Sequence, residues 1–515
     1  MFVPILQRGL SHGSWDQKWN NSSVPMSNRK IQGIMTLDRE LGFTPVFRLR
    51  EMIVSKEISP VELVESHLRR ADELDPKLGI FITRSSDMAI DAAREAEAAL
   101  MRGDDLGPLH GIPVPYKDTE PVKGVRWTHG SLTYIDNIAE IDSLPVERVK
   151  AAGGIITGKT NTPENGFSGT TENLVAPPAR NPWNPDKTPG GSSGGASAAV
   201  ASGLTSFATG GDGGGSIRIP AAFAGVYGIK ATQGRVPRLA VHTRNAGYNI
   251  MNNATSGPLT RTVRDAADTL AILSGYDPRG EYDTINDDVP DYVGALARGV
   301  KGLKIGWTQD MGGNPVDPEV VRIAENAARI FEDLGANVES VDFKPAGHEE
   351  VFWTFFDYFT VKGLDAARSD FDNHREEMTD YFGEYMDRAN TLSAERMWNI
   401  FSNIGAYRKY VNEYFGEYDL LLSPTLAVPA FDINDPPDII DGRRVPHRLW
   451  GFTPFTYLFN MTGNPAASAP AGFSVSGLPV GLQIIGDMKD ETTVFAASAA
   501  YEEARPWAGN KPPVS

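Results

Sequence analysis

Polar and apolar positions along the chain follow two patterns, a helical one and a strand-like one. The helical pattern is clearest after Ser59-Pro60-Val61-Glu62, where a serine, a proline in the first turn and a glutamate three residues after the serine form a capping box. Apolar residues then recur every three or four positions from 61 to 71. A second amphipathic run, 319–334, ends at Gly335. Both segments are predicted to be helices.

Short apolar runs bounded by turn residues predict buried strands. They lie at 112–116, 154–157, 303–307, 337–341, 420–423 and 480–485. Helix-length amphipathic segments separate them, which is typical of an α/β sheet covered by helices. Because the chain has no repeat of fixed period and no long linker, we expect one large domain over residues 37–515, preceded by a polar N-terminal extension over residues 1–36.

Composition narrows the class of protein. The chain has 515 residues, 41% of them hydrophobic, and its 49 basic and 66 acidic side chains give a formal net charge of −17. An acidic protein is a poor default partner for nucleic acid, whose phosphates are bound mainly by lysine and arginine. The absence of cysteine excludes disulfides and thiolate chemistry. No apolar stretch has the roughly 18 residues of a membrane span. We therefore expect a cytoplasmic protein that binds neither nucleic acid nor membrane.

Two segments depart from the average composition. Residues 345–418 are helical in pattern and rich in aromatic side chains, which could pack a core or line an apolar substrate pocket. Residues 188–228 are dense in glycine, yet they are interleaved with apolar runs such as 198–201 that look packed. Such glycine density indicates backbone with positive φ or close approach of a ligand. Because GGDGGGS precedes Pro220, we expect a tight loop that leads into a helix and suits an anion.

Two generic motifs compete for this region. Residues 153–160 (GGIITGKT) match a phosphate-binding loop, but a helix precedes them and Ile155-Ile156 is strand-like, so the context is wrong. Ser193 matches the GxSxG nucleophile elbow, although its flanks do not read as strand followed by helix. No histidine has the spacing of a metal site, and we expect no metal and no cofactor.

A longer set of motifs resembles one family over its whole length. GGSSGG (190–195), DGGGSIRIP (212–220) and GVYGIKAT (225–232) resemble the signature of the amidase signature family of serine hydrolases. The similarity continues in GIPVPYKD (111–118), GKTNTPE (158–164), GPLTRTVRDAA (257–267), NMTGNPAASAPAG (460–472) and GLPVGLQIIG (477–486). The resemblance implies a single α/β domain with a central mixed, twisted sheet covered by helices on both faces, and a signature core over residues 111–270.

The resemblance also implies a Ser-Ser-Lys triad. Ser216 matches the acylating nucleophile, Ser192 the bridging serine on a cis peptide bond, and Lys117 the base. The chemistry is consistent with these three residue types. A serine hydroxyl needs a base within hydrogen-bond reach, and a lysine acts as one only when neutral, so its pKa must be lowered. A middle hydroxyl can both accept and donate the proton.

Supporting residues follow from the same motifs. The backbone N–H groups of Gly213, Gly214, Gly215 and Ser216 match the family's oxyanion hole. Ser193, Asp212 and Arg218 match positions that hold the serine loops, although Asp212 and Arg218 could equally form only a structural ion pair. Gly166 and Ser168 match the segment beside the nucleophile, whereas Lys159 and Lys230 are interpreted as structural.

The expected activity is hydrolysis of a carboxylic amide through an acyl-serine, with a small-molecule amide as substrate. The aromatic segment favours an aryl or otherwise apolar acyl group. Aryl carbamates, ureas and esters remain open to the same triad, and the resemblance also implies a homodimer. A rival of another class is the glutaminase component of a tRNA-dependent amidotransferase, which typically has SIRQP where this chain has SIRIP, with Ile219. Gly213 also departs from the family's usual threonine or isoleucine.

Overall fold

The computed structural model describes residues 28–239 and 253–515. Its helices include both predicted ones: the capping box at Ser59 and Glu62 is present, and the second amphipathic run begins at Pro318. The α-helices are α1 (Asn28–Phe43), α2 (Val46–Val54), α3 (Pro60–Leu78), α4 (Ser86–Arg102), α5 (Leu144–Ala151), α6 (Gly194–Ala201), α7 (Arg218–Ala224), α8 (Val263–Leu273), α9 (Tyr292–Ala295), α10 (Pro318–Asp333), α11 (His348–Asn373), α12 (Asp380–Thr391), α13 (Ala394–Phe415), α14 (Leu458–Thr462) and α15 (Glu491–Ala504).

All six predicted strands are present, and none of their ends is shifted by more than three residues. The structure adds others that lack a strong apolar pattern. The strands are β1 (Phe81–Arg84), β2 (Pro113–Lys117), β3 (Ile155–Thr160), β4 (Phe207–Asp212), β5 (Tyr227–Lys230), β6 (Thr255–Thr260), β7 (Lys304–Trp307), β8 (Asn337–Ser340), β9 (Leu420–Pro424), β10 (Ile439–Ile440), β11 (Arg443–Arg444), β12 (Ala466–Phe473) and β13 (Pro479–Gly486).

A mixed eight-stranded sheet forms the centre, in the order β4-β6-β5-β12-β13-β9-β7-β8. Neighbours from β4 to β9 are antiparallel, whereas β7 pairs parallel with both β9 and β8. A three-stranded sheet, β1-β3-β2, is separate in its hydrogen bonding. Strand β2 nevertheless packs beside β4 at the edge of the large sheet. This contact brings the GIPVPYKD and GGDGGGS motifs together.

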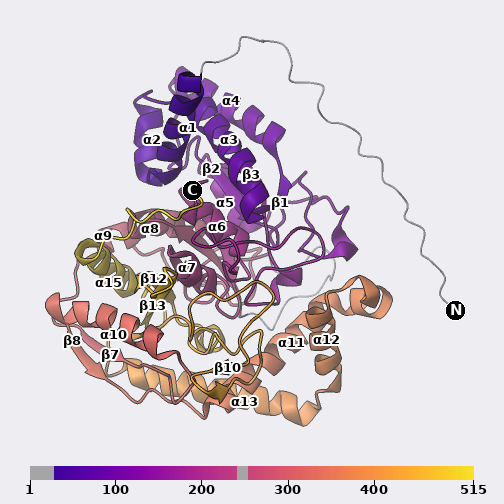
Figure 1. Cartoon of the computed structure of the whole chain (residues 1–515), viewed down its shortest axis with the longest axis vertical. Coiled ribbons are helices and arrows are strands. Elements are labelled where there is room, and N and C mark those ends of the chain that lie inside the picture. The colour runs from indigo at the N-terminus through magenta and orange to yellow at the C-terminus, as the bar shows by residue number, and fades with distance from the viewer. Residues whose placement is uncertain (1–27, 240–252) are drawn as a thin grey trace.

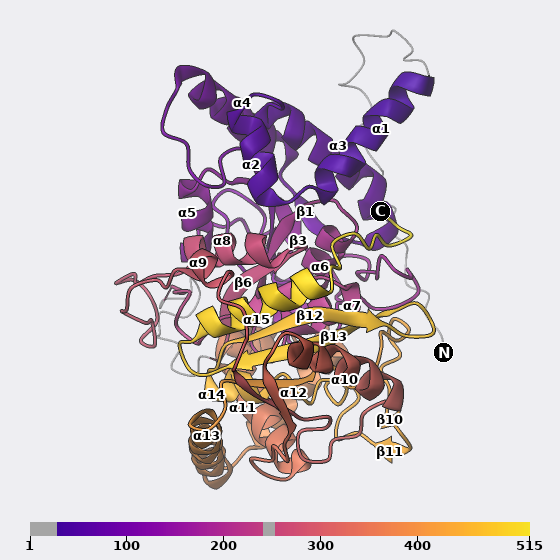
Figure 2. The same ribbon diagram turned by 90° about the vertical axis from the view of Figure 1, so that its left-hand side faces the viewer.

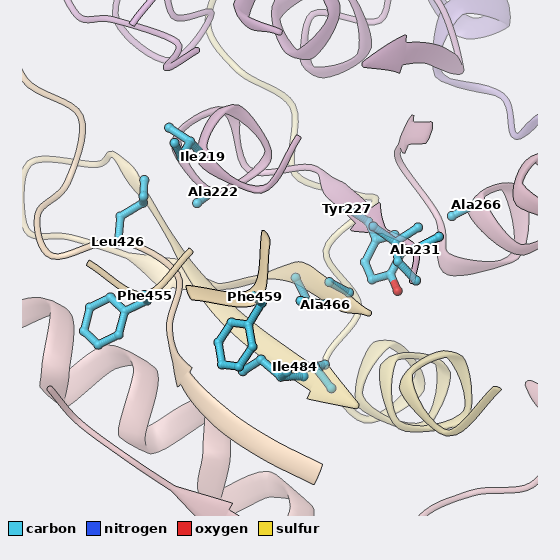
Figure 3. Close-up of a cluster of buried hydrophobic side chains, with 14 of the residues drawn as sticks. Ile219, Ala222, Tyr227, Ala231, Ala266, Leu426, Phe455, Phe459, Ala466 and Ile484 are labelled. Atoms are coloured by element: carbon cyan, nitrogen blue, oxygen red, sulfur yellow. The ribbon is translucent and has the colours of Figure 1, made fainter. Parts of the chain in front are cut away.

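Helices surround the sheet. Helices α1 to α4 gather at one end of the molecule and α11 to α13 at the other, with the long strands β12 and β13 between them (Figures 1 and 2). Every residue of β13 is buried, as in a strand covered on both faces. Figure 3 shows part of the main core, to which α7 contributes Ile219 and Ala222, and β13 contributes Ile484. The predicted α/β fold with a mixed central sheet is confirmed.

The predicted extension is described only in part. Residues 1–27 lie outside the described residues, and the proposed boundary at 36/37 falls inside α1. Along the described chain, no helix is both long and apolar enough to span a bilayer. The aromatic-rich segment is helical, as predicted, and forms α11, α12 and α13.

Candidate active site

Lys117 is the last residue of β2, where that strand lies against β4. Its side chain is 2% exposed, and its Nζ donates a hydrogen bond of 2.6 Å to Ser192 Oγ and one of 3.3 Å to the Gly211 carbonyl oxygen. The structure therefore brings two of the three predicted catalytic side chains into direct contact, although they are 75 residues apart in the sequence.

The surroundings of Lys117 favour a neutral amine. Burial lowers the pKa of Lys117 from 10.5 to about 7, because a charged ammonium loses its hydration there. The carboxylates of Asp212 and Glu120 oppose this shift, and the Arg238 guanidinium adds to it. A lysine with this pKa is partly deprotonated near neutral pH, which is the state that can accept a proton.

The two serine loops are held against each other. Ser192 follows a cis peptide bond, Gly191–Ser192, and the Ser193 N–H donates to the Ser216 carbonyl oxygen over 3.2 Å. Ser216 is 2% exposed. Among the described residues, its hydrogen bond is the one that its main-chain carbonyl accepts from Ser193, and its hydroxyl has none. Gly166, at φ +76°, passes beside Ser192: a Cβ placed on it would lie 3.4 Å from Ser192 Oγ.

The loop from Asp212 to Ser216 is hydrogen-bonded asymmetrically. All five of its carbonyl oxygens accept a hydrogen bond, from Asn460 Nδ2, Asn253 Nδ2, Thr456 Oγ1, Ile219 N and Ser193 N in turn. Of its amides after Asp212, only that of Gly215 has a partner among the described residues: it donates to Asp212 Oδ1 over 2.8 Å. The carboxylate thus removes Gly215 from the predicted oxyanion donors and leaves the N–H groups of Gly213, Gly214 and Ser216.

Asp212 and Arg218 do more than pair with each other. Besides the ion pair of 3.0 Å, the Asp212 carboxylate accepts hydrogen bonds from the backbone N–H groups of Gly215 and Ile217. Arg218 also donates to the carbonyl oxygen of Thr456 and to two side-chain oxygens, those of Gln483 and Asn460. Burial alone would raise the pKa of Asp212, but the Arg218 guanidinium holds it well below its usual range. The pair therefore fixes the glycine loop.

Aromatic side chains of α11 border this loop. A Cβ placed on Gly214 would lie 2.8 Å from Phe355 Cζ and 3.1 Å from Trp450 Cζ3, and one on Gly213 would lie 3.8 Å from Phe359 Cε2. Phe359 in turn stacks on Phe167, with ring centroids 4.3 Å apart. These rings pack with one another and also flank the loop, so core packing and contact with the site are not exclusive.

Ser168 lies at the edge of a separate hollow. It is one of the residues that line a cavity of about 660 Å³, together with Thr170, Tyr381 and His447. Its Oγ lies 3.0 Å from Thr170 Oγ1. The carbonyl oxygen of Thr170 touches Gly191, so close that a Cβ on that glycine would lie 2.1 Å away. The cavity therefore adjoins the segment that carries Ser192.

Comparison with known proteins identifies the family. The family model described as Amidase matches residues 62–495. The chain belongs to the amidase family. The chain is 36% identical over 478 residues to an acylamidase of Rhodococcus erythropolis, covering 92% of this chain and 98% of that protein. It is 33% identical over 482 residues to a component of the glutamyl-tRNA(Gln) amidotransferase of Lactiplantibacillus plantarum, covering 88% and 94%.

Solved structures agree with this assignment. A bacterial aryl acylamidase of the amidase signature enzymes matches with a TM-score of 0.85 and 35% identity, covering 91% of this chain and 99% of that one. A 6-aminohexanoate cyclic dimer hydrolase matches with a TM-score of 0.80 and 28% identity, covering 92% and 99%. The predicted membership of the amidase signature family is confirmed, and hydrolysis of amide bonds is the activity that this membership supports.

Other lysines of the amidase motifs have structural contacts. Lys159 is fully buried in β3, 3.6 Å from an Asp118 carboxylate oxygen. Residues 155–160 of GGIITGKT form this strand, not a phosphate-binding loop. Lys230 donates to the carbonyl oxygens of Ala231 and Asn464. Ser193 precedes helix α6, which its flanks did not predict, but no strand precedes it as a nucleophile elbow requires.

Sequence reasoning missed three side chains that hold the glycine loop from outside. Asn253, Thr456 and Asn460 each donate to one of its carbonyl oxygens. Asn460 opens a motif that carried the amidase resemblance, which was a usable signal. Asn253 and Thr456 lie in no motif, so only the fold reveals them.

Proposed function

We propose that this chain hydrolyses acyl amides through an acyl-enzyme on Ser216, with Ser192 as proton relay and Lys117 as base. The observation that carries the proposal is the buried 2.6 Å hydrogen bond between Lys117 Nζ and Ser192 Oγ. It lies beside a loop with three backbone N–H groups that have no partner in the described part of the chain. The amine with its lowered pKa and the anion-binding loop are the two features that an activated serine requires.

The chemical steps follow from these groups. Ser216 Oγ attacks the amide carbon while its proton passes to Ser192 Oγ, and the Ser192 proton passes to Lys117 Nζ. The carbonyl oxygen becomes an oxyanion that the N–H groups of Gly213, Gly214 and Ser216 stabilise. The C–N bond then breaks as a proton returns along the same path to the nitrogen, and the amine leaves. A water molecule repeats the sequence and releases the acid from Ser216.

An aryl or otherwise apolar acyl group is the substrate class that we propose. Phe355 and Phe359 border the glycine loop, and apolar rings next to that loop favour an apolar acyl chain. The acylamidase of R. erythropolis and the bacterial aryl acylamidase point the same way. Carbamates, ureas and esters with the same acyl geometry would use the same steps.

A second candidate rests on the relatives that are components of amidotransferases. In that case the substrate would be glutamine and activity would need partner proteins. Ile219 argues against it, because a fully buried isoleucine of the core stands where that component typically carries glutamine. We also propose that the protein is a homodimer and that it is cytoplasmic, as the sequence predicts.

The test uses the purified full-length chain without partners. Turnover is measured on an anilide, a short aliphatic amide, an aryl carbamate, a urea, an aryl ester and glutamine, and we expect the anilide to be hydrolysed and glutamine not. A fluorophosphonate should label the wild type once per chain and leave Ser216→Ala unlabelled. Ser197→Ala, which removes a buried hydroxyl of α6, should be labelled like the wild type. Full labelling of Ser216→Ala would overturn the nucleophile assignment.

A further inference from the structure

Each of the three oxyanion-donor amides of the glycine loop belongs to a peptide group whose carbonyl oxygen is hydrogen-bonded. The N–H of Ser216 shares its peptide with the Gly215 carbonyl, which accepts from Ile219 N over 2.6 Å. The N–H of Gly213 shares its peptide with the Asp212 carbonyl, which accepts from Asn460 Nδ2 over 3.0 Å. The third peptide, between Gly213 and Gly214, has a carbonyl that accepts from Asn253 Nδ2 over 2.8 Å.

A hydrogen bond to a peptide carbonyl strengthens the same peptide as a donor. The donor draws electron density onto the carbonyl oxygen and makes the N–H of that peptide more positive, so hydrogen bonds in a chain reinforce one another. In the loop, the strengthened N–H groups are the ones that we propose as donors to the oxyanion. Asn253 and Asn460 supply it from side chains, whereas Ile219 supplies it from the first turn of α7.

The orientation of the Asn253 amide is fixed by its partners. A carbonyl oxygen can only accept, so the nitrogen of the Asn253 side chain must face Gly213 and the oxygen must face away from it. That oxygen, Oδ1, accepts from Lys362 Nζ of α11 over 2.8 Å. The Asn253 main-chain carbonyl accepts from Asn460 Nδ2 over 3.2 Å, and Asn253 is 1% exposed. Turning the side-chain amide over would break both of its hydrogen bonds.

We propose that Asn253 is a positioning residue for amide hydrolysis, whose side-chain N–H strengthens the Gly214 N–H as an oxyanion donor, and that Lys362 holds the Asn253 amide in the orientation this requires. The inference rests on the proposed function, because it assigns the loop the role of an oxyanion hole. Neither residue touches the substrate. Both act through the peptide between Gly213 and Gly214.

The decisive variant is Asn253→Asp. It keeps the shape and the acceptor toward Lys362, but it has no N–H for the Gly213 carbonyl. Loss of a whole oxyanion donor costs about a hundredfold or more in kcat. Weakening one donor should cost less, about fivefold, with little change in KM. Lys362→Met should lower kcat about threefold by freeing the Asn253 amide, and Lys362→Arg should restore most of it.

Two readouts separate this role from a merely structural one. Turnover is expressed per serine titrated to completion with a fluorophosphonate, so that misfolded chains do not count. The affinity for an aryl boronic acid, whose serine adduct mimics the tetrahedral oxyanion, should fall by the same factor as kcat, while the affinity for the product acid stays constant. Asn464→Asp is the matched control, because this buried asparagine donates to the Gly486 carbonyl away from the loop.

The outcomes are separable from those of the proposed function. Unchanged kcat per titrated serine in Asn253→Asp, or a loss no larger than in Asn464→Asp, would overturn the role of Asn253 while leaving hydrolysis at Ser216 intact. If Asn253→Asp does not fold, Lys362→Met decides, and wild-type turnover in that variant would overturn the inference. Activity in Ser216→Ala would instead remove the proposed function itself.

Discussion

Replacing Lys117 with methionine should abolish turnover and at the same time change how stability depends on pH. The unfolded chain keeps the lysine proton up to about pH 10.5, whereas the folded protein releases it near pH 7. Between these values the unfolded state binds more protons, so the stability of the wild type rises with pH. Lys117→Met has no such proton. One pKa unit corresponds to about 1.36 kcal/mol. Between pH 7.5 and pH 9, the free energy of unfolding of the wild type should therefore rise by about 2 kcal/mol relative to that of the variant.

This difference is independent of the contacts that the substitution breaks. Losing the hydrogen bonds to Ser192 and Gly211 shifts the variant's stability by a constant amount, which cancels when two pH values are compared. The assay is urea unfolding of both proteins at the two pH values, followed by tryptophan fluorescence. Parallel curves, with the same stability difference at pH 7.5 and pH 9, would refute the lowered pKa and with it the neutral base.

Three further outcomes follow from the same geometry. The kcat/KM of the wild type should rise with pH through an apparent pKa of about 7, because only neutral Lys117 accepts a proton, and a profile flat from pH 6 to 8 would contradict this. Gly214→Ala should lose most of its kcat, because the new Cβ would lie 2.8 Å from Phe355 Cζ. Gly213→Ala should stay active in the same assay, because the nearest atom to its new Cβ would be 3.4 Å away, an ordinary contact distance. Arg218→Met should lower the stability in urea by about 3–5 kcal/mol, because it leaves the Asp212 carboxylate buried and unpaired; a loss below about 1 kcal/mol would argue against that role.

Local patterns determined most of the fold class and the candidate residues. The capping box at Ser59 and the closing glycine at 335 mark helices through backbone hydrogen bonds that neighbours in sequence satisfy, so they can be read without the fold. Apolar runs likewise mark β7, β9 and β13, because a strand buried on both faces is apolar along its length. The linear motifs identified Lys117, Ser192 and Ser216 in the same way, because each of these residues is recognised from the residues next to it in the sequence.

Strands β4 and β6 were not predicted, because their glycines, threonines and proline carry little apolar periodicity and pairing alone makes them strands. In the sequence, the Gly215 amide cannot be told apart from the amides of its neighbours. In the structure, its N–H donates a hydrogen bond to the Asp212 carboxylate. The sequence by itself determined the family, the helices and the chemical groups available for catalysis. Only the tertiary structure decided which of those groups meet, since the contacts of Lys117 with Ser192 and of Asn253 with Gly213 join segments far apart in the chain.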